Sequence, residues 1–115
     1  MTAFDFPQLK RALEQSDAVA LSRLYAQDAE MTIVDRHRSP QNPLRLTGRP
    51  AIAAFWRDLC ARDMTHRVAH EIVGDTRAAF IEHGAYPDGC HVLSAMTLDL
   101  HDGRIVRHLT VQASD

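Results

Sequence analysis

Three residues in this sequence have the side chains that proton transfer requires: Asp35, His83 and His108. The chain has seven histidines among 115 residues, and imidazole gives or takes a proton near neutral pH. A carboxylate that orients one imidazole, with a second imidazole nearby, supplies an acid and a base next to a carbonyl group. The alternative is that Asp35 is a solvated strand end and that both histidines are hydrogen-bonded on a polar sheet face.

A second pair of histidines, His66 and His70, has the four-residue spacing of a metal-binding pair on a helix. The residues around them are typical of a strand, where this spacing separates the two side chains by about 13 Å, too far for one ion. The chain has only five glycines, and they form no phosphate-binding loop. We therefore expect no metal site and no nucleotide or other cofactor.

The first half of the chain contains three helical patterns. Apolar residues recur at helical spacing from Phe6 to Leu13, and either Ser16 or Asp17 caps a second helix that ends near Tyr25. A third helix begins at Pro50, which is tolerated in a first turn. Its apolar positions follow the spacing of a core-facing helix: Ile52, Phe55, Trp56, Leu59 and Cys60.

Strand patterns fill most of the remaining chain. One strand is expected at residues 31–35, before a proline-rich loop at residues 36–47. Four more are expected at residues 66–73, 77–86, 91–100 and 104–112, the last two joined by an Asp102-Gly103 hairpin. Helices followed by an antiparallel meander predict an α+β fold, with residues 1–115 forming a single domain.

Composition excludes several classes of partner. With 13 basic and 15 acidic residues the net charge is -2, so we expect no nucleic acid and no anionic membrane surface as a partner. The longest strictly apolar stretch, Ala51 to Trp56, is far shorter than a membrane span of about 20 residues. No export signal accompanies Cys60 and Cys90, so we expect a cytoplasmic protein without a disulfide.

Four segments occur in a characteristic order along nearly the whole chain: LYAQDAEM, LTGRPAIAAFW, IVGDTRAAFIEH and LDLHDGRIVRH. In this order they resemble the SnoaL-like branch of the nuclear transport factor 2-like superfamily. The resemblance implies a curved antiparallel sheet wrapped around three helices, which forms a cone with an apolar pocket. It also implies a homodimer paired through the outer sheet face. Relatives include ketosteroid isomerase, scytalone dehydratase, limonene epoxide hydrolase, polyketide cyclases and members without catalysis, so the fold does not choose the function.

The Asp102-Gly103 turn sets which side chains of the last hairpin share a face. A two-residue turn places Thr97 opposite His108, and side chains then alternate between two faces. The residues alone favour burial of the more apolar face, which contains Met96, Leu98, Leu100, Ile105, Leu109 and Val111. The resemblance instead implies that the other face lines the cone and that the apolar face meets a partner subunit. That other face contains Leu93, Thr97, Val106, His108 and Thr110.

The same resemblance extends to other parts of the expected pocket. It places Ile81 and His83 on the pocket side of their strand, and Asp35 where ketosteroid isomerase-like relatives have a catalytic carboxylate. Tyr25 either closes the core or contacts the cavity, while the spacing of Phe55 and Trp56 already explains them as core residues. The expected ligand pocket comprises Tyr25, Phe55, Trp56, Ile81, Leu93, Thr97, Val106 and Thr110.

Two functions fit these expectations. One is a cofactor-independent lyase, isomerase or cyclase that acts on a small cyclic or polyketide-like carbonyl compound through Asp35, His83 and His108. The other is a non-catalytic module on the same fold that binds a small apolar ligand or assembles with partners. The first helix has no tyrosine and Ala95 stands near the second acid of ketosteroid isomerase, so the oxyanion site of that enzyme is not expected. The enzyme hypothesis requires the three side chains to converge on one cavity.

Overall fold

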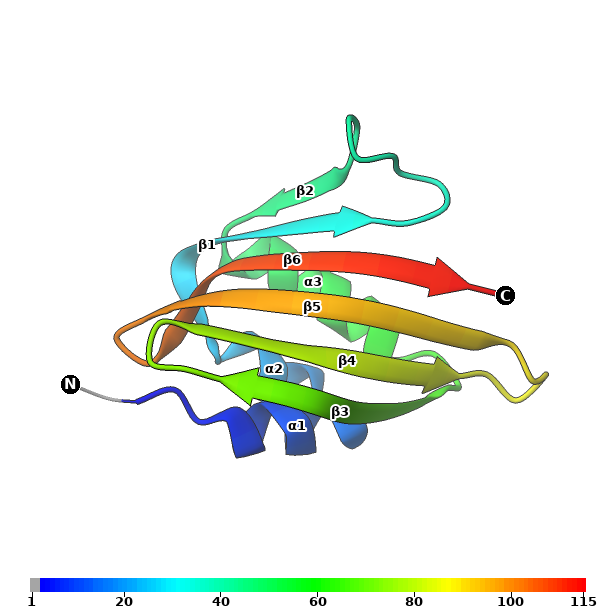
Figure 1. Ribbon diagram of the computed structural model, residues 1–115, viewed down its shortest axis with the longest axis horizontal. Coiled ribbons are helices and arrows are strands. Elements are labelled where there is room, and N and C mark those ends of the chain that lie inside the picture. Colours follow the sequence, from blue (N-terminus) through cyan, green and yellow to red (C-terminus); the bar gives the residue numbers. More distant parts are fainter. Residues whose placement is uncertain (1–2) are drawn as a thin grey trace.

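Three helices pack against one face of a six-stranded sheet (Figure 1). The computed structural model describes residues 3–115. The helices are α1 (Phe6–Glu14), α2 (Ala18–Ser22) and α3 (Arg49–Cys60). The strands are β1 (Tyr25–Val34), β2 (Leu44–Thr47), β3 (Thr65–Val73), β4 (Arg77–Ala85), β5 (His91–His101) and β6 (Arg104–Ser114).

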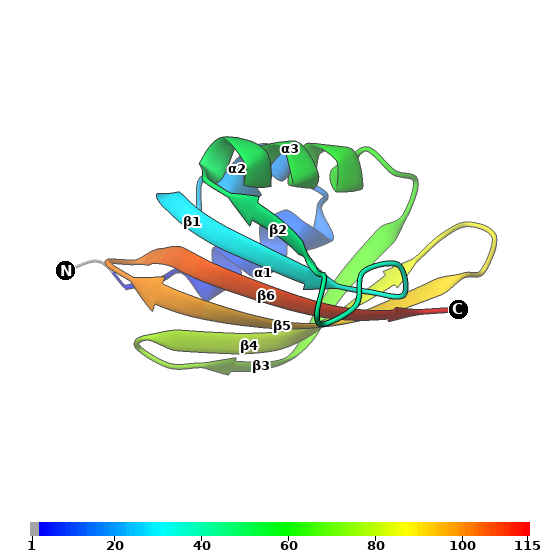
Figure 2. The same cartoon turned by 90° about the horizontal axis from the view of Figure 1, so that it is seen from above.

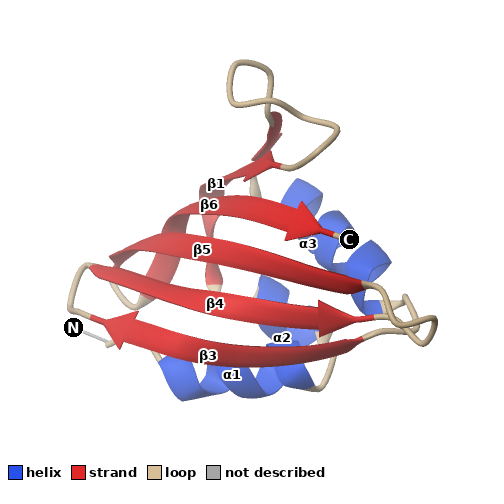
Figure 3. Ribbon diagram, turned by 45° about the vertical axis from the view of Figure 1, so that its right-hand side comes forward, coloured by secondary structure: helices blue, strands red, loops and turns tan. Residues whose placement is uncertain are grey.

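The sheet has the strand order β2-β1-β6-β5-β4-β3 and curves around the helices (Figures 2 and 3). The predicted α+β fold, a curved sheet on three helices, is therefore confirmed. One detail differs, because β1 and β6 run parallel and make the sheet mixed rather than wholly antiparallel. The helix-covered side of the sheet is called the inner face below, and the opposite side is called the outer face.

The second helix ends earlier than the sequence pattern predicts. Its last residue is Ser22, and Tyr25 is the first residue of β1 rather than the end of a helix. The backbone carbonyls that would continue the helix bond elsewhere: Leu24 accepts from the Ile105 amide, and Tyr25 accepts twice from the Arg49 guanidinium, at 3.0 and 2.8 Å. These contacts hold the chain extended at this point, and tertiary structure overrides local helical spacing.

The loop after β1 is also shorter than predicted, because residues 44–47 pair with β1 as strand β2. The remaining loop projects away from the helices and the rest of the sheet in Figure 3. Within residues 3–115, no helix combines the length and apolar character of a membrane span. The cytoplasmic location stays a prediction.

The core lies between the inner face and the helices. Phe6 of α1 contacts Phe80 of β4 edge to face, with 5.6 Å between ring centroids. The largest buried side chains also come from every part of the chain: Leu13, Leu21, Tyr25, Met31, Ile52, Trp56, Leu98 and Ile105. Burial of this apolar surface is the main contribution to folding.

A β-bulge at Val106 changes the register of the last hairpin. His101 pairs with Arg104 and Leu100 with Ile105, but Asp99 then pairs with Arg107, so Val106 is an extra residue on β6. Thr97 consequently lies opposite Leu109, and the predicted pairing of Thr97 with His108 is wrong. His108 and Thr110 therefore share the inner face with Met96, Leu98 and Leu100 of β5.

The facing predicted for β4 and β5 is also wrong. Phe80 is buried against α1, so by alternation Glu82 points inward and Ile81 and His83 point outward. Pairing between β4 and β5 has no bulge, and Phe80 lies opposite Met96. Two predicted pocket residues of β5, Leu93 and Thr97, therefore lie on the outer face.

Candidate functional site

A cavity of about 110 Å³ opens between the C-terminal end of α3 and the inner face of the sheet. Its apolar wall includes Ile33, Phe55, Trp56, Leu59 and Met96. Its polar wall includes Glu82, Ser94, Thr110 and Gln112. This volume is below the roughly 300–1,000 Å³ of sites for drug-sized ligands, so it fits a small molecule.

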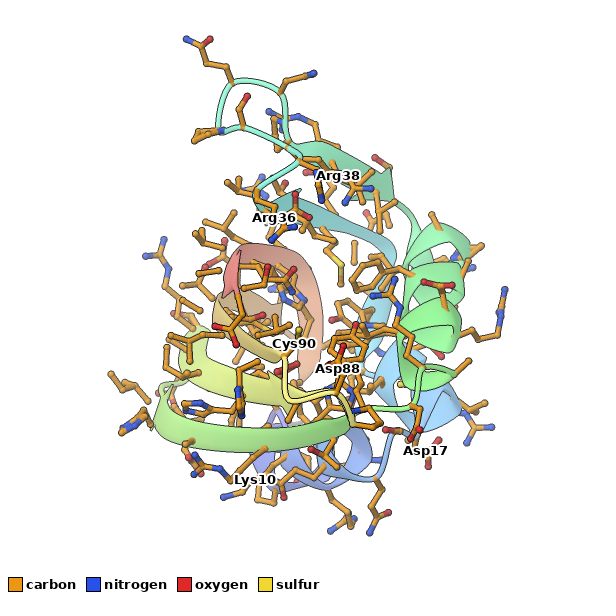
Figure 4. The ribbon with its side chains drawn as sticks, turned by 90° about the vertical axis from the view of Figure 1, so that its right-hand side faces the viewer. Lys10, Asp17, Arg36, Arg38, Asp88 and Cys90 are labelled. Carbon is orange, nitrogen blue, oxygen red and sulfur yellow. The ribbon has the colours of Figure 1, made fainter. Side chains whose placement is uncertain are left out.

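The mouth of this cavity is at the end of the molecule viewed in Figure 4, where Arg36 and Arg38 follow β1 and Cys90 lies in the turn after β4. A shallow hollow of about 260 Å³ adjoins the cavity here and shares Tyr86 and Gln112 with it. A ligand that enters the cavity therefore has further room at its solvent side.

A buried carboxylate and imidazole form one end of the site. His66 Nδ1 lies 3.1 Å from Glu82 Oε1, and the two residues are 6% and 3% exposed. The other two polar atoms of the pair, Glu82 Oε2 and His66 Nε2, are buried and have no hydrogen-bond partner among the described residues. A buried polar atom without a partner costs free energy, so such an atom on Glu82, which lines the cavity, marks a candidate functional group.

The absence of a side chain at Gly84 leaves space for the Glu82 carboxylate. A Cβ atom at position 84 would lie 2.7 Å from Met64 Cε and 3.3 Å from Glu82 Oε2. Met64 and Glu82 both line the cavity, so their ends occupy the space that a larger residue at position 84 would fill.

Four side chains form a buried hydrogen-bonded chain on the opposite wall. Trp56 Nε1 donates to the Tyr25 hydroxyl at 3.2 Å, and this hydroxyl lies 2.7 Å from His108 Nδ1. His108 Nε2 lies 2.8 Å from Thr110 Oγ1. Burial lowers the pKa of His108 to about 3 and raises the pKa of Tyr25, so both side chains are neutral at pH 7. Trp56 and Thr110 line the cavity, and His108 and Tyr25 lie behind its wall.

Two further polar residues connect these walls. Ser94 lies opposite Glu82 on β5, and its hydroxyl accepts from Gln112 Nε2 at 3.2 Å. The inner face thus presents a polar stripe across β4, β5 and β6, enclosed by apolar side chains from α3 and β1.

The predicted catalytic residues are not brought together. Asp35 lies at the cavity mouth, where its carboxylate accepts from the His37 amide at 2.9 Å and from Arg38 Nη1 at 3.2 Å. His108 is in the core with both ring nitrogens bonded to protein groups. His83 lies on the outer face, because it alternates with Glu82 along β4.

The predicted pocket residues are divided in the same way. Phe55, Trp56 and Thr110 line the cavity, and the Tyr25 side chain is buried behind it. Val106 is half-buried at the bulge and does not line this cavity. Ile81, Leu93 and Thr97 lie on the outer face.

Sequence reasoning missed Glu82, His66 and Ser94 as site residues, whereas the resemblance placed Gln112 on the pocket side, where it lines the cavity. The available signal was alternation from Phe80, the large aromatic residue of β4, which assigns Glu82 to the core face. Likewise His66 alternates into the core together with the buried Val68. His70 does not share that facing, because β3 is irregular between Ala69 and Ile72 and His70 has a φ of 57°.

The mouth has paired charges. Arg62 donates to the Tyr86 hydroxyl at 3.2 Å and to Asp58 at 2.9 Å, and these two hydrogen bonds raise its pKa. Arg38 is paired with Asp35. No group of three or more His, Cys, Asp or Glu side chains in the described part of the chain is placed to hold a metal ion.

A comparison of the sequence with models of protein families identifies the family of this chain. The family model described as the SnoaL-like domain matches residues 8–108. The chain belongs to the SnoaL-like family. This confirms the resemblance to the nuclear transport factor 2-like superfamily in its SnoaL-like branch.

Solved structures place this SnoaL-like chain among proteins of low sequence identity. A nuclear transport factor 2-like protein of unknown function from Mesorhizobium loti is 19% identical with a TM-score of 0.81, over 93% of this chain and 86% of that one. A candidate ketosteroid isomerase from Kribbella flavida is 19% identical with a TM-score of 0.77, over 93% and 73%. A candidate polyketide cyclase from Pseudomonas putida is 23% identical with a TM-score of 0.71, over 96% and 90%. No curated protein matches the SnoaL-like chain.

Proposed function

We propose that this SnoaL-like protein binds a small, mostly apolar carbonyl compound in the cavity and that Glu82 removes a proton from the carbon next to the carbonyl. The observation that supports this proposal is that Glu82 lines the cavity and has one buried carboxylate oxygen, Oε2, without a hydrogen-bond donor among the described residues. No described protein group donates to the lone pairs of this oxygen, so they are open to a substrate proton.

The His66 imidazole holds the carboxylate in place. His66 Nδ1 lies 3.1 Å from Glu82 Oε1 and carries the hydrogen of this contact when the carboxylate is ionised, while Oε2 has no described partner. The substrate C–H bond breaks, its proton moves to Oε2, and the electron pair moves to the carbonyl oxygen as an enolate forms. Return of the proton to another carbon gives an isomer. Attack of the enolate carbon on a second carbonyl instead forms a C–C bond and an alkoxide, which takes the proton back from Glu82 to give a cyclised product.

Two of the similar structures support the same class of reaction. They belong to proteins assigned as a candidate ketosteroid isomerase and a candidate polyketide cyclase. Both names denote reactions at a carbon next to a carbonyl, as proposed for Glu82. The proposed reaction requires no metal and no organic cofactor.

A second candidate function is a non-catalytic module that binds a small ligand. It is favoured by the separation of Asp35, His83 and His108, which form no joint acid/base set. A screen of small carbonyl and hydroxy-carbonyl compounds with wild type and Glu82→Gln distinguishes the two. Turnover that disappears in Glu82→Gln supports the enzyme, whereas binding without turnover in the wild type supports the module.

We further propose that two copies of the chain pair through the outer face. The outer face exposes Ile72, Leu93, Leu109 and Val111, which are 40–74% exposed, and it is hollowed by a groove of about 530 Å³. Exposed apolar area of this kind is typical of protein contact sites.

A row of alternating charges crosses the same face. Register places Glu30 beside Arg107, Arg107 beside Asp99, and Asp99 beside Arg77, and all four line the groove. A two-fold axis along the strands through the middle of this row sets each charge opposite the unlike charge of a second copy. The row is therefore complementary to itself, which supports a homodimer over an unrelated partner.

A further inference from the structure

The hydrogen bonds from Trp56 to Thr110 have one consistent direction. The indole N–H only donates, so the Tyr25 oxygen accepts from Trp56. The tyrosine hydrogen then has one described acceptor, His108 Nδ1, which must be unprotonated to accept it. A neutral imidazole has its hydrogen on the other nitrogen, so His108 Nε2–H donates to Thr110 Oγ1.

The reverse direction leaves a hydrogen without an acceptor. If Thr110 donated to His108 and His108 donated to Tyr25, the Tyr25 oxygen would accept two bonds and its own hydrogen would be buried unpaired. A doubly protonated His108 has the same defect, because both nitrogens then donate. The chain therefore runs from Trp56 toward the cavity.

The Thr110 hydroxyl hydrogen remains at the end of this chain. Its oxygen already accepts from His108, and the hydroxyl makes no second hydrogen bond to a described residue. Its neighbours on the adjacent strands are Met96 and Ile33, whose side chains contain no oxygen. Thr110 is 5% exposed and lines the cavity. The hydrogen is thus available to an acceptor inside the cavity.

We infer that Thr110 donates a hydrogen bond to the carbonyl oxygen of the substrate, and that His108, Tyr25 and Trp56 position this donor. The inference rests on the proposed role of Glu82. Strand β5 lies between the strands of Glu82 and Thr110, a lateral separation of roughly 10 Å, which leaves room for one small molecule between base and donor.

The arrangement stabilises charge as it develops. When the proton moves to Glu82, negative charge grows on the substrate oxygen, and a fixed donor in a site with little water lowers the energy of that state. The bond that Thr110 accepts from His108 polarises its hydroxyl and strengthens its own donation. Of the four residues in the hydrogen-bonded chain, Thr110 contacts the substrate and is catalytic, whereas Trp56, Tyr25 and His108 are positioning residues.

The direct test is the carbonyl stretching frequency of bound cyclopentanone, measured by difference infrared spectroscopy. Wild type, Thr110→Ser and Glu82→Gln should show the same lowered frequency, because each retains a hydroxyl donor at position 110. Thr110→Val should shift the band upward, and Thr97→Val, on the outer face, should not. An equal frequency in wild type and Thr110→Val overturns the inference, and cyclopentanone that does not bind to wild type contradicts both proposals.

Turnover separates the two proposals. With 3-cyclopenten-1-one as substrate, isomerisation to the conjugated enone should be abolished in Glu82→Gln. Its kcat should fall by roughly 10- to 100-fold in Thr110→Val and should be retained in Thr110→Ser. If isomerisation is lost in Glu82→Gln but has an unchanged kcat in Thr110→Val, the Thr110 inference alone is overturned. A shifted carbonyl band without turnover supports the Thr110 contact and contradicts the role of Glu82.

The positioning chain has a readout in the free protein. Nitrogen-15 NMR should show His108 as the neutral tautomer with its hydrogen on Nε2. The opposite tautomer would show that Thr110 donates to His108 and not into the cavity, and it would overturn the inference.

Discussion

Glu82 and His83 are neighbours on β4, and their side chains lie on opposite faces of the sheet. Glu82 is 3% exposed and lines the inner cavity, while His83 lies on the outer face with Leu93. One position along the strand thus separates a residue enclosed among the helices from a residue on the face proposed for dimerisation. Because Glu82 and not His83 faces the cavity, the proposed proton acceptor is Glu82. Substitution of His83, its neighbour on the outer face, then serves as the control for substitution of Glu82.

Tyr25→Phe should destabilise the protein by about 1–3 kcal/mol, because it leaves the Trp56 N–H and His108 Nδ1 buried without partners. Urea unfolding followed by the fluorescence of Trp56, the single tryptophan, measures the effect. The matched control is Tyr86→Phe, whose hydroxyl bonds the exposed Arg62 at the mouth and should cost less than about 0.5 kcal/mol. Equal losses in the two variants would contradict the buried chain.

His108 should make stability depend on pH. Its folded pKa of about 3 lies below the unfolded value of 6.5, so the unfolded chain binds the extra proton between these values. Stability from this residue is present above the unfolded pKa and falls as pH drops from 7 to 5, by about 2 kcal/mol.

Urea unfolding at the two pH values checks this effect. His108→Gln should lose that part of the pH dependence, although it is less stable at pH 7, while His83→Gln should keep it. An unchanged difference between pH 7 and pH 5 in His108→Gln would show that His108 is not held neutral.

Gly84→Ala should alter the cavity more than the fold. The new methyl meets Met64 Cε, the end of a flexible side chain that can move, so the free energy of unfolding should change by less than about 1 kcal/mol. Displacement of Met64 and Glu82 should weaken cyclopentanone binding, as measured by NMR titration. The double variant Met64→Ala/Gly84→Ala should restore binding, and a double variant as weak as Gly84→Ala would contradict this steric explanation.

The outer face should be sensitive to charge if it pairs with a second copy. Leu109→Lys places an amino group among Leu93 and Val111 and should convert a dimer to a monomer in sedimentation at micromolar concentration. Val19→Lys, at an exposed position of α2, should leave the dimer intact. A wild-type protein that sediments as a monomer would remove the assembly proposal.

The order of helices and strands is predictable from local patterns, as with the helix begun by Pro50 and the hairpin at Asp102-Gly103. The facing of side chains is less predictable, because one extra residue reverses it. At Val106 the bulge lets Leu100 and His108 point to the same side, which no regular two-residue hairpin allows.

The site depends on this facing and on contacts between distant segments. Glu82 and His66 come from neighbouring strands, whereas Trp56, Tyr25 and His108 come from three separate parts of the chain. No spacing in the sequence indicates such contacts. The one sequence signal for Glu82 is the expected burial of Phe80: side chains alternate along a strand, so residue 82 shares the face of residue 80.

The central claim is that Glu82 is the proton acceptor of the cavity. Deuterium incorporation from D2O into 3-cyclopenten-1-one, followed by proton NMR, tests it in wild type, Glu82→Gln and His83→Gln. Glu82→Gln should reduce exchange to the uncatalysed rate, because the amide cannot accept the proton, whereas His83→Gln should exchange as fast as wild type. Exchange that persists in Glu82→Gln, or that is lost in His83→Gln, would contradict the account.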